Sequence, residues 1–491
     1  MSLATSAIAT WDLSGCDVQV RRLFLLANDL ERTYELLRRD ETRLAGWRGP
    51  AADAARPRLL CTATAASRLA AAVRRVADGI RSGLSSLADA VAAAAAPQSL
   101  SQHEEVIALV TVTDARMAAA VSLGGQSVGT ASFDGPRLPP SGADPDDVTG
   151  WWTALPPDQR AVAMRSYAGQ LGALAGLPSA ARDAANRLEL ARLVAALRAE
   201  RELLAARALS TIPPELNRMA SVRQQLAVAE NVARELAALA RRGRPASLLT
   251  LDLNGYGRVA IGIGDLDRAR HVAVVVPGMG QDAARGVGRT VELAGRLRDE
   301  AARVSTDDTA VVAWVGYAAP GWAQVPFPTR AWAGGRSLAA DLRALASART
   351  ATGRDRPHLT VVGHSYGSTV VGAAATTTAL PADDLVLLGS PGVLARRAAD
   401  LGRPPGRVYV GEAPLDPVAD LGAFGPDPGD RCFGATRMRA DPGPGVPVWE
   451  RLTGGDHSHY FDPDSESLRN IARVVVGRGG EVTRSDTGRG Q

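Results

Sequence analysis

The stretch HLTVVGHSYGSTVVGAAATT, residues 358–377, decides the fold. An apolar, β-branched run leads into GHSYG, residues 363–367, and small residues follow, which predicts a strand, a sharp turn and a helix. Ser365 has glycine two residues away on each side, as a strained strand-to-helix turn requires. Its hydroxyl would stand at the carboxyl edge of a sheet, beside helix N–H groups that favour negative charge. We expect Ser365 to be a nucleophile; the alternative is a Gly- and Ser-rich turn in a Rossmann-like protein.

Apolar runs on both sides of this stretch alternate with helical segments. Two alternating segments, 249–253 and 259–263, surround an Asn-Gly-Tyr-Gly turn and predict a hairpin. Continuous runs of the kind found in sheets covered on both faces occur at 271–278, 309–317, 358–365, 384–392 and 407–412. The sequence therefore predicts a mainly parallel α/β sheet flanked by helices over residues 247–478.

An oxyanion hole requires a second N–H donor from the loop after an earlier strand. The sequence VVVPGMGQ, residues 274–281, ends a predicted strand in such a loop. We expect the backbone N–H groups of Met279 and Tyr366 to be the two donors. The Gly-x-Gly of this loop is also typical of phosphate binding, but the GxGxxG pattern is absent and the chain contains no lysine for a P-loop.

An acid and a histidine would follow the serine along the chain in this arrangement. Asp416 comes just after the apolar run at 407–412, and Pro417 fixes the turn behind it. Its competitors are Glu412, Asp420 and Asp427, and a plain turn or helix-capping role for Asp416 is the alternative.

The chain has six histidines, and four of them stand at other places in the predicted fold: His103, His271, His358 and His364. The remaining two, His457 and His459, lie in GGDHSHYFDP between a predicted strand at 447–452 and a predicted helix at 465–477. A base at either position is compatible with the spacing. A zinc site at Asp456, His457 and His459 would need a further ligand and an open position, so metal binding is the weaker interpretation.

Residues 270–477 resemble the actinobacterial α/β-hydrolases of the DUF1023 family. The resemblance rests on VVVPGMGQ, VVGHSYGSTVVG, LLGSPGV, DPVADLGAFGPDP and HSHYFDPDSESLRNIA, and it extends upstream through GLPSAARDAANR to Trp151-Trp152. It implies an α/β-hydrolase fold and a triad of Ser365, Asp416 and a histidine in an H-S-x-Y pattern. That pattern places the base at His457, although this sequence departs from it by carrying His459 at the variable position.

The first part of the chain is predicted to be all α-helical. Apolar residues repeat every three or four positions over 17–95 and indicate two helices around GWRGP, residues 46–50. A hairpin with Trp47-Arg48-Gly49 at its bend resembles the WXG100 proteins, which implies a type VII secretion partner; the alternative is a plain helical hairpin. The family's Tyr-x-x-x-Asp/Glu export signal does not follow the second helix.

These patterns divide the chain into five regions. They are a WXG100-like helical hairpin domain (1–123), a linker rich in Gly, Pro, Ser and Asp (124–150), a helical region packing on the hydrolase (151–246), the α/β domain (247–478) and a disordered tail (479–491).

Composition restricts the function classes. Charged residues make up 22% of the chain and the net charge is +4, with arginine spread along the sequence and mixed with acids, so no nucleic-acid footprint is expected. The three cysteines are far apart and predict neither a disulfide framework nor a thiolate metal site. No Sec-type signal peptide and no membrane span are recognisable, which fits a cytoplasmic protein or one exported by another route.

Aromatic residues are scarce, at 4% of the chain, yet four gather in one Pro- and Gly-rich loop after a predicted strand: Tyr317, Trp322, Phe327 and Trp332. This loop is predicted to be a lid or apolar pocket wall for an ester or acyl substrate; a structural loop is the alternative. The sequence as a whole predicts a serine hydrolase that acts on ester or other acyl bonds without a metal or organic cofactor. The rival prediction is a secretion-linked interaction protein with a weakly active or inactive hydrolase domain.

Overall fold

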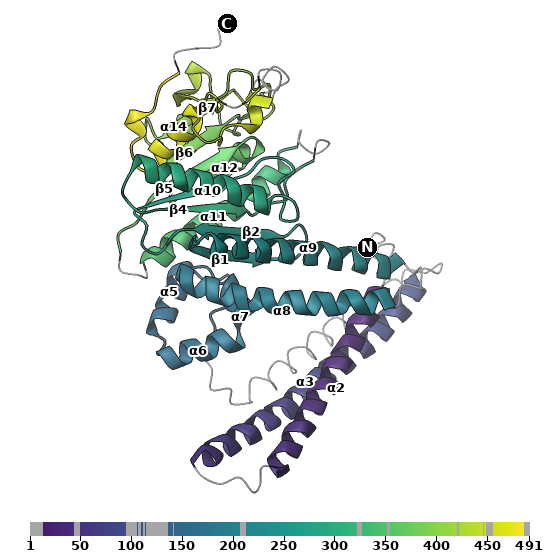
Figure 1. Ribbon diagram of the computed structural model, residues 1–491. Helices are drawn as coiled ribbons and strands as arrows, with labels where there is room; N and C mark the ends of the chain where they lie inside the picture. Colours follow the sequence, from purple (N-terminus) through teal and green to yellow (C-terminus); the bar gives the residue numbers. More distant parts are fainter. Residues whose placement is uncertain are drawn as a thin grey trace. The chain divides into compact units, whose positions relative to one another are not determined.

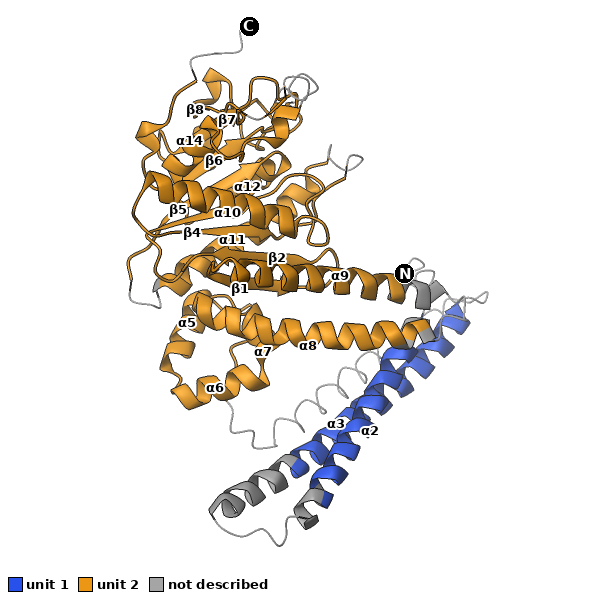
Figure 2. Ribbon diagram, viewed as in Figure 1, with its two compact units in different colours: residues 1–134 blue, residues 135–491 orange. Residues whose placement is uncertain are grey.

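The computed structural model describes most of the chain, which divides into two compact units, residues 1–134 and 135–491 (Figure 2). The described residues are 13–43, 50–94, 106, 110, 113, 136–140, 142–206, 213–321, 327–350, 354–419, 422–444, 446–447 and 455–485. The boundary between the units falls inside the predicted linker 124–150.

The first unit is built on two long helices, α2 (Ser14–Arg43) and α3 (Pro50–Ala94) (Figure 1). Arg74 of α3 ties them together, since its Nη2 donates to Asn28 Oδ1 (2.8 Å) and to Glu31 Oε2 (2.9 Å) on α2. Two helices therefore occupy the predicted positions, whereas Trp47 and Arg48 at the predicted bend lie outside the described residues.

The second unit contains an eight-stranded sheet in the order β1-β2-β4-β3-β5-β6-β7-β8. β1 and β2 form the predicted antiparallel hairpin, β2 also pairs antiparallel with β4, and all later pairs are parallel. The strands are β1 (Ala246–Asp252), β2 (Arg258–Ile263), β3 (His271–Val276), β4 (Thr309–Val315), β5 (His358–His364), β6 (Asp384–Leu388), β7 (Val408–Glu412) and β8 (Thr436–Arg439). Strand β8 was not expected, because TRMR lacks an apolar run; most of the strand predicted at 447–452 lies outside the described residues.

Helices cover both faces of this sheet (Figure 1). Alternate residues of each central strand point to opposite sides, so Val272 and Val274 join one core cluster while Ala273 and Val275 join the other. The first cluster includes α11 (Thr329–Thr350) and α12 (Tyr366–Thr377), and the second includes α8 (Ser179–Ala206), α9 (Pro213–Arg241), α10 (Val287–Val304) and α14 (Glu466–Val475). Because the strands are buried on both faces, their sequences are continuous apolar runs, which is the pattern from which they were predicted.

The helices that precede the sheet belong to the same unit. They begin with α5 (Pro145–Ala154), α6 (Pro157–Ser166) and α7 (Ala168–Ala173), which share a small core around Trp152 and Leu171. Asp144 caps α5 by accepting the Asp146 N–H (2.9 Å). The linker prediction is thus wrong for its last residues, because Asp144-Pro145 is a helix start signal that the polar composition obscured. No helix within the described ranges combines the length and apolar character that crossing a bilayer would require.

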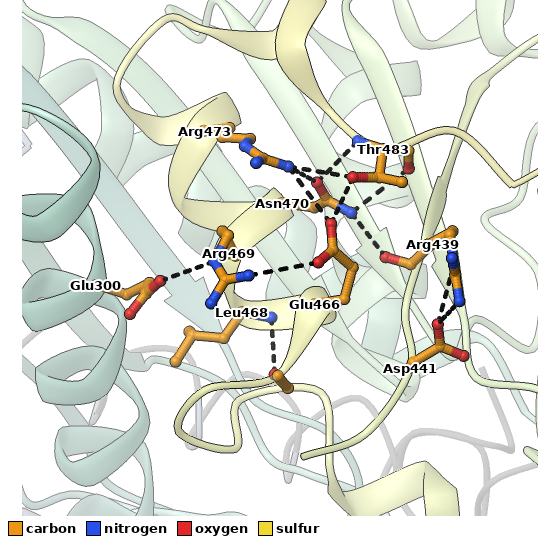
Figure 3. Close-up of polar contacts among 10 residues, drawn as sticks. Glu300, Arg439, Asp441, Glu466, Leu468, Arg469, Asn470, Arg473 and Thr483 are labelled. Atoms are coloured by element: carbon orange, nitrogen blue, oxygen red, sulfur yellow. Dashed lines mark hydrogen bonds and ion pairs between the residues drawn. The ribbon is translucent and has the colours of Figure 1, made fainter. Parts of the chain in front are cut away.

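The predicted disorder from residue 479 is wrong for residues 479–485. These residues form the 3₁₀ helix η7 (Gly479–Glu481) and a bridge between Arg484 and Met438 of β8. Thr483 lies in a polar network with α14, in which its N–H donates to Asn470 Oδ1 (3.0 Å) and Asn470 Nδ2 donates to Arg439 O (3.0 Å) (Figure 3). Residues 486–491 lie outside the described residues.

Candidate active site

Ser365 occupies a strained turn between β5 and α12. Its φ of 55° and ψ of −131° fall outside the regions that L-residues normally adopt. The turn is fixed by the Ser365 N–H, which donates to Leu388 O (2.8 Å), and by the Ser368 N–H, which donates to Ser365 O (2.9 Å). A Cβ at Gly367 would come within 2.3 Å of Val276 O, so only glycine fits this close approach.

Three side chains from separate loops form a continuous chain of hydrogen bonds at the carboxyl edge of the sheet. Ser365 Oγ lies 2.9 Å from His457 Nε2, and His457 Nδ1 lies 2.8 Å and 2.9 Å from the two carboxylate oxygens of Asp416. Ser365 follows β5, Asp416 follows β7, and His457 lies in the 3₁₀ helix η6 (Gly455–Ser458). Because parallel strands end at the same edge, segments 92 residues apart in the sequence meet there.

The Asp416 carboxylate is buried and fully engaged. Tyr460 donates its hydroxyl to Oδ2 (2.6 Å), and the Val418 N–H donates to Oδ1 (2.9 Å). Burial alone would raise the pKa of Asp416, but the donors His457, Tyr460 and Val418 outweigh it and lower this pKa below its usual value. Asp416 is therefore held as the charged partner of the imidazole.

Tyr460 is itself fixed by the backbone, because its hydroxyl accepts the Ala413 N–H (2.9 Å) while donating to Asp416. Gly389 packs directly against the Asp416–His457 pair. A Cβ at Gly389, whose φ is +50°, would come within 2.4 Å of Asp416 Oδ2 and 3.0 Å of His457 Nδ1. Sequence reasoning did not single out either residue, although Tyr460 stands in the H-S-x-Y pattern and Gly389 in LLGSPGV.

His364 lies against the other side of His457. The ring centroids are 4.9 Å apart, and the His364 Nε2–H donates to the His457 carbonyl oxygen (2.8 Å). Burial, and then the neighbouring His457, lower the pKa of His364 to about 3, so the ring is neutral near neutral pH. His364 therefore supports the loop that carries His457. Among the described residues, the ring that hydrogen-bonds Ser365 Oγ is that of His457.

His459 points to a different partner. Its Nδ1 lies 2.5 Å from Asp462 Oδ2, and Arg296 of α10 lies 3.3 Å from the other oxygen of the same carboxylate. Of the two histidines that the sequence left as alternatives, His457 is the one brought to Ser365 and Asp416. Among the residues that the structure describes, no group of three or more His, Cys, Asp or Glu side chains has the arrangement of a metal site.

The competing acids occupy other environments. Glu412 ends β7, and Asp427 accepts the Gly429 N–H (2.8 Å) in a local turn. Asp420 lies outside the described residues.

The loop after β3 approaches the serine closely. A Cβ at Gly278 would lie 2.7 Å from Ser365 Cβ, so the backbone next to Met279 passes beside the serine hydroxyl. Neither the Met279 N–H nor the Tyr366 N–H donates a hydrogen bond within the described part of the chain. The Tyr317 hydroxyl secures the loop by donating to Pro277 O (2.7 Å).

The four aromatic residues predicted to form a pocket wall lie in different settings. Tyr317 is buried and stacks between Trp314 and Tyr366, so it supports the loop after β3 from inside the core. Trp332 is partly buried against the core cluster that contains Tyr317, and Phe327 is exposed. Trp322 lies outside the described residues. The prediction of a lid or apolar pocket wall does not fit Tyr317, because its aromatic ring is buried and fills core space beneath the loop.

Comparison with known proteins gives the family. Residues 252–426 match the model of an α/β hydrolase family. The uncharacterized protein Rv0963c of Mycobacterium tuberculosis is 34% identical over 213 residues, which cover 40% of this chain and 78% of the relative. The uncharacterized protein Rv2079 of the same species is 32% identical over 381 residues, or 70% of this chain and 57% of the relative. The chain thus spans little more than half the length of that longer relative.

Solved structures with a similar region include an esterase of Pyrobaculum calidifontis, at 15% identity and a TM-score of 0.31, covering 50% of this chain and 90% of the esterase. The family assignment rests instead on the match to the family model and on the mycobacterial relatives. With a mostly parallel sheet flanked by helices and an all-helical region before it, the chain belongs to the α/β hydrolase family and is related to the mycobacterial proteins named above.

Proposed function

We propose that the protein is a serine hydrolase that cleaves ester or other acyl bonds with Ser365, His457 and Asp416. The observation that carries the proposal is the unbroken hydrogen-bonded chain from Ser365 Oγ through the His457 ring to the buried Asp416 carboxylate. Membership of the α/β hydrolase family supports hydrolysis as the reaction class.

The geometry suits a two-step acyl transfer. His457 Nε2, 2.9 Å from Ser365 Oγ, accepts the hydroxyl proton as the oxygen attacks the carbonyl carbon. The same proton then passes to the leaving group, and a water molecule attacks the acyl-enzyme with His457 again as base. Asp416 holds Nδ1 protonated and stabilises the positive charge that the ring acquires.

The oxyanion of the tetrahedral intermediate would be bound by the N–H groups of Met279 and Tyr366. Tyr366 is the first residue of α12, so its N–H points out of the helix N-terminus, where the helix dipole favours negative charge. Met279 follows Gly278, which packs against Ser365. Two preorganised donors of this kind are worth about 3–4 kcal/mol each in transition-state stabilisation.

A series of p-nitrophenyl esters of increasing chain length tests the proposal. We expect wild-type protein to release p-nitrophenol and Ser365→Ala to lose this activity while it keeps the far-UV circular dichroism of the wild type. Ser368→Ala is a matched control, since Ser368 lies one helical turn away and hydrogen-bonds Ser365 O rather than its hydroxyl. Equal rates for wild type and Ser365→Ala would refute the proposal.

The helical hairpin favours a second role in binding a type VII secretion component. On α2, the side chains of Val18, Leu25 and Leu36 are exposed and recur at spacings of seven and eleven, which places them on one side of the helix. The test is co-purification with a type VII component. Binding that is lost in Leu25→Arg but retained in Arg32→Ala would support this role. Retention by both variants would count against it.

A further inference from the structure

A pocket lies at the amino-terminal edge of the sheet, at the opposite ends of the strands from Ser365. It adjoins the start of β5, where His358 is one of its lining residues, and the loop that leads into β3. Its volume is about 810 Å³, which is within the range of small-molecule sites. Nothing in the proposed hydrolysis uses this pocket.

Arginine dominates the lining of this pocket. Three separate chain segments contribute five guanidinium groups: Arg268 and Arg270 before β3, Arg349 near the end of α11, and Arg354 and Arg356 before β5. The described lining contains two carboxylates, Asp355 and Asp383. Five positive and two negative charges leave a formal charge of +3 with the histidine neutral.

Arg349 holds one of these positive charges in a fixed position. Its side chain is buried, and its guanidinium donates to Leu266 O (2.9 Å) and Arg268 O (3.2 Å). Burial, and then the charge of Arg354, lower the pKa of Arg349. Arg349 and Arg354 both line the pocket, and a bound anion would relieve the repulsion between their like charges.

The remaining arginines are available to a ligand to different degrees. Arg356 is paired with Asp383, which removes that carboxylate as a counter-charge for the others. Arg268 and Arg270 are mostly exposed. Their side-chain ion pairs to other described residues are long, at 3.7 Å, and go to Asp265 and Asp307 outside the pocket lining. Arg354 makes no ion pair or hydrogen bond within the described residues.

We propose that this pocket binds a small anion with two or more phosphate groups. A guanidinium group matches phosphate oxygens with two parallel hydrogen bonds, and arginines from three segments can engage several phosphates at once. The described lining has no Trp, Tyr or Phe side chain that could stack on a nucleobase, so the phosphate groups themselves are the recognised feature.

Isothermal titration of the full chain with inorganic pyrophosphate at about 0.15 M salt tests the proposal, because this salt concentration screens diffuse surface attraction. We expect one pyrophosphate per chain. The double variant Arg268→Gln with Arg354→Gln should weaken binding about ten-fold or more, since it removes two charge-assisted donors. Both side chains are exposed, so far-UV circular dichroism and the melting temperature should stay at wild-type values.

The matched control is Arg192→Gln with Arg241→Gln, which removes the same charge from exposed positions on α8 and α9. We expect it to bind pyrophosphate like the wild type. An equal loss in the two double variants, several weak sites per chain, or no heat of binding would each overturn the proposal.

A sedimentation assay distinguishes a soluble ligand from a lipid headgroup with the same chemistry. Vesicles of phosphatidylcholine with and without a phosphatidylinositol bisphosphate are mixed with the protein, with and without pyrophosphate. Binding to the bisphosphate lipid that the Arg268 and Arg354 variant loses identifies a membrane source, and pyrophosphate binding alone identifies a soluble one. The Ser365→Ala protein should behave like wild type in both assays, so failure here leaves the proposed hydrolase function independently testable.

Discussion

The hydroxyl of Tyr460 donates a 2.6 Å hydrogen bond to Oδ2 of Asp416, the carboxylate oxygen that lies 2.8 Å from His457 Nδ1. Tyr460 and His457 are three residues apart, so one short loop supplies both the imidazole and a donor that fixes its carboxylate partner. The same hydroxyl accepts the Ala413 N–H on the segment that carries Asp416. Tyr460 therefore binds the acid loop and the histidine loop to each other.

Tyr460→Phe should weaken both the fold and the reaction. It removes the hydrogen bond that the Tyr460 hydroxyl accepts from the Ala413 N–H, which costs about 1 kcal/mol in the free energy of unfolding. Loss of a donor to Asp416 should lower kcat for a p-nitrophenyl ester with little change in KM, because the Tyr460 side chain is buried and acts through Asp416. Urea unfolding and steady-state kinetics measure the two effects.

Tyr409→Phe is the control for this variant. Tyr409 is also buried, but its hydroxyl makes no hydrogen bond within the described residues. Its removal should leave kcat and the unfolding midpoint nearly unchanged. Similar losses for both variants would mean that the Tyr460 hydroxyl has no special role.

The two neighbouring histidines should differ sharply on substitution. His457→Ala removes the base beside Ser365 and should lower kcat by about a thousandfold or more. His459→Ala removes the contact with Asp462 but leaves the hydrogen bonds of Ser365 and Asp416 in place, and it should cost less than about tenfold. Ester kinetics on the two variants provides the comparison, and a larger loss for His459→Ala would contradict the assignment.

A methyl group at Gly389 should disturb the Asp416–His457 pair directly. Its Cβ would lie 2.4 Å from Asp416 Oδ2, so the carboxylate or the backbone must shift. We expect Gly389→Ala to lower kcat by about a hundredfold, since small displacements of catalytic groups have effects of this size. Gly406→Ala is the matched control, because Gly406 also has a positive φ (+78°) but no atom within 4 Å of the added Cβ. Equal losses of activity would assign the effect to backbone strain.

The sequence predicted the features that local patterns carry. The turn at Ser365 and the central strands follow from glycine spacing and apolar runs, and the place of Asp416 follows from the end of a predicted strand. The choice of His457 over His459 came only from the resemblance to a family pattern. The contacts of Tyr460 and Gly389 could not be predicted, because they depend on how loops far apart in the sequence meet at the sheet edge. Strand β8 and the ordered segment 479–485 were missed for a related reason, since polar residues there are stabilised by partners such as Asn470.

His364 predicts a specific dependence of stability on pH. Its pKa is about 3 in the folded protein and about 6.5 in an unfolded chain, so below pH ~6.5 the unfolded state binds a proton that the folded state does not. The free energy of unfolding should therefore fall as the pH drops from about 6.5 toward about 3. Between about pH 7 and about pH 5 this one group would account for up to about 2 kcal/mol.

His364→Gln should make that decline shallower, because glutamine does not titrate and its amide can still donate to the His457 carbonyl oxygen. Urea unfolding of both proteins at about pH 7 and about pH 5 measures the difference. An identical change in both proteins would show that His364 titrates normally in the folded state.

Covalent labelling with a fluorophosphonate shows whether Ser365 is a nucleophile activated by His457. In this reaction the serine oxygen bonds to phosphorus and fluoride leaves, so mass spectrometry of the digested protein locates the adduct. We expect one adduct per chain, on the peptide that contains Ser365. The adduct should be absent from Ser365→Ala and should form much more slowly in His457→Ala. No adduct on wild-type protein, or an adduct that persists in Ser365→Ala, would contradict it.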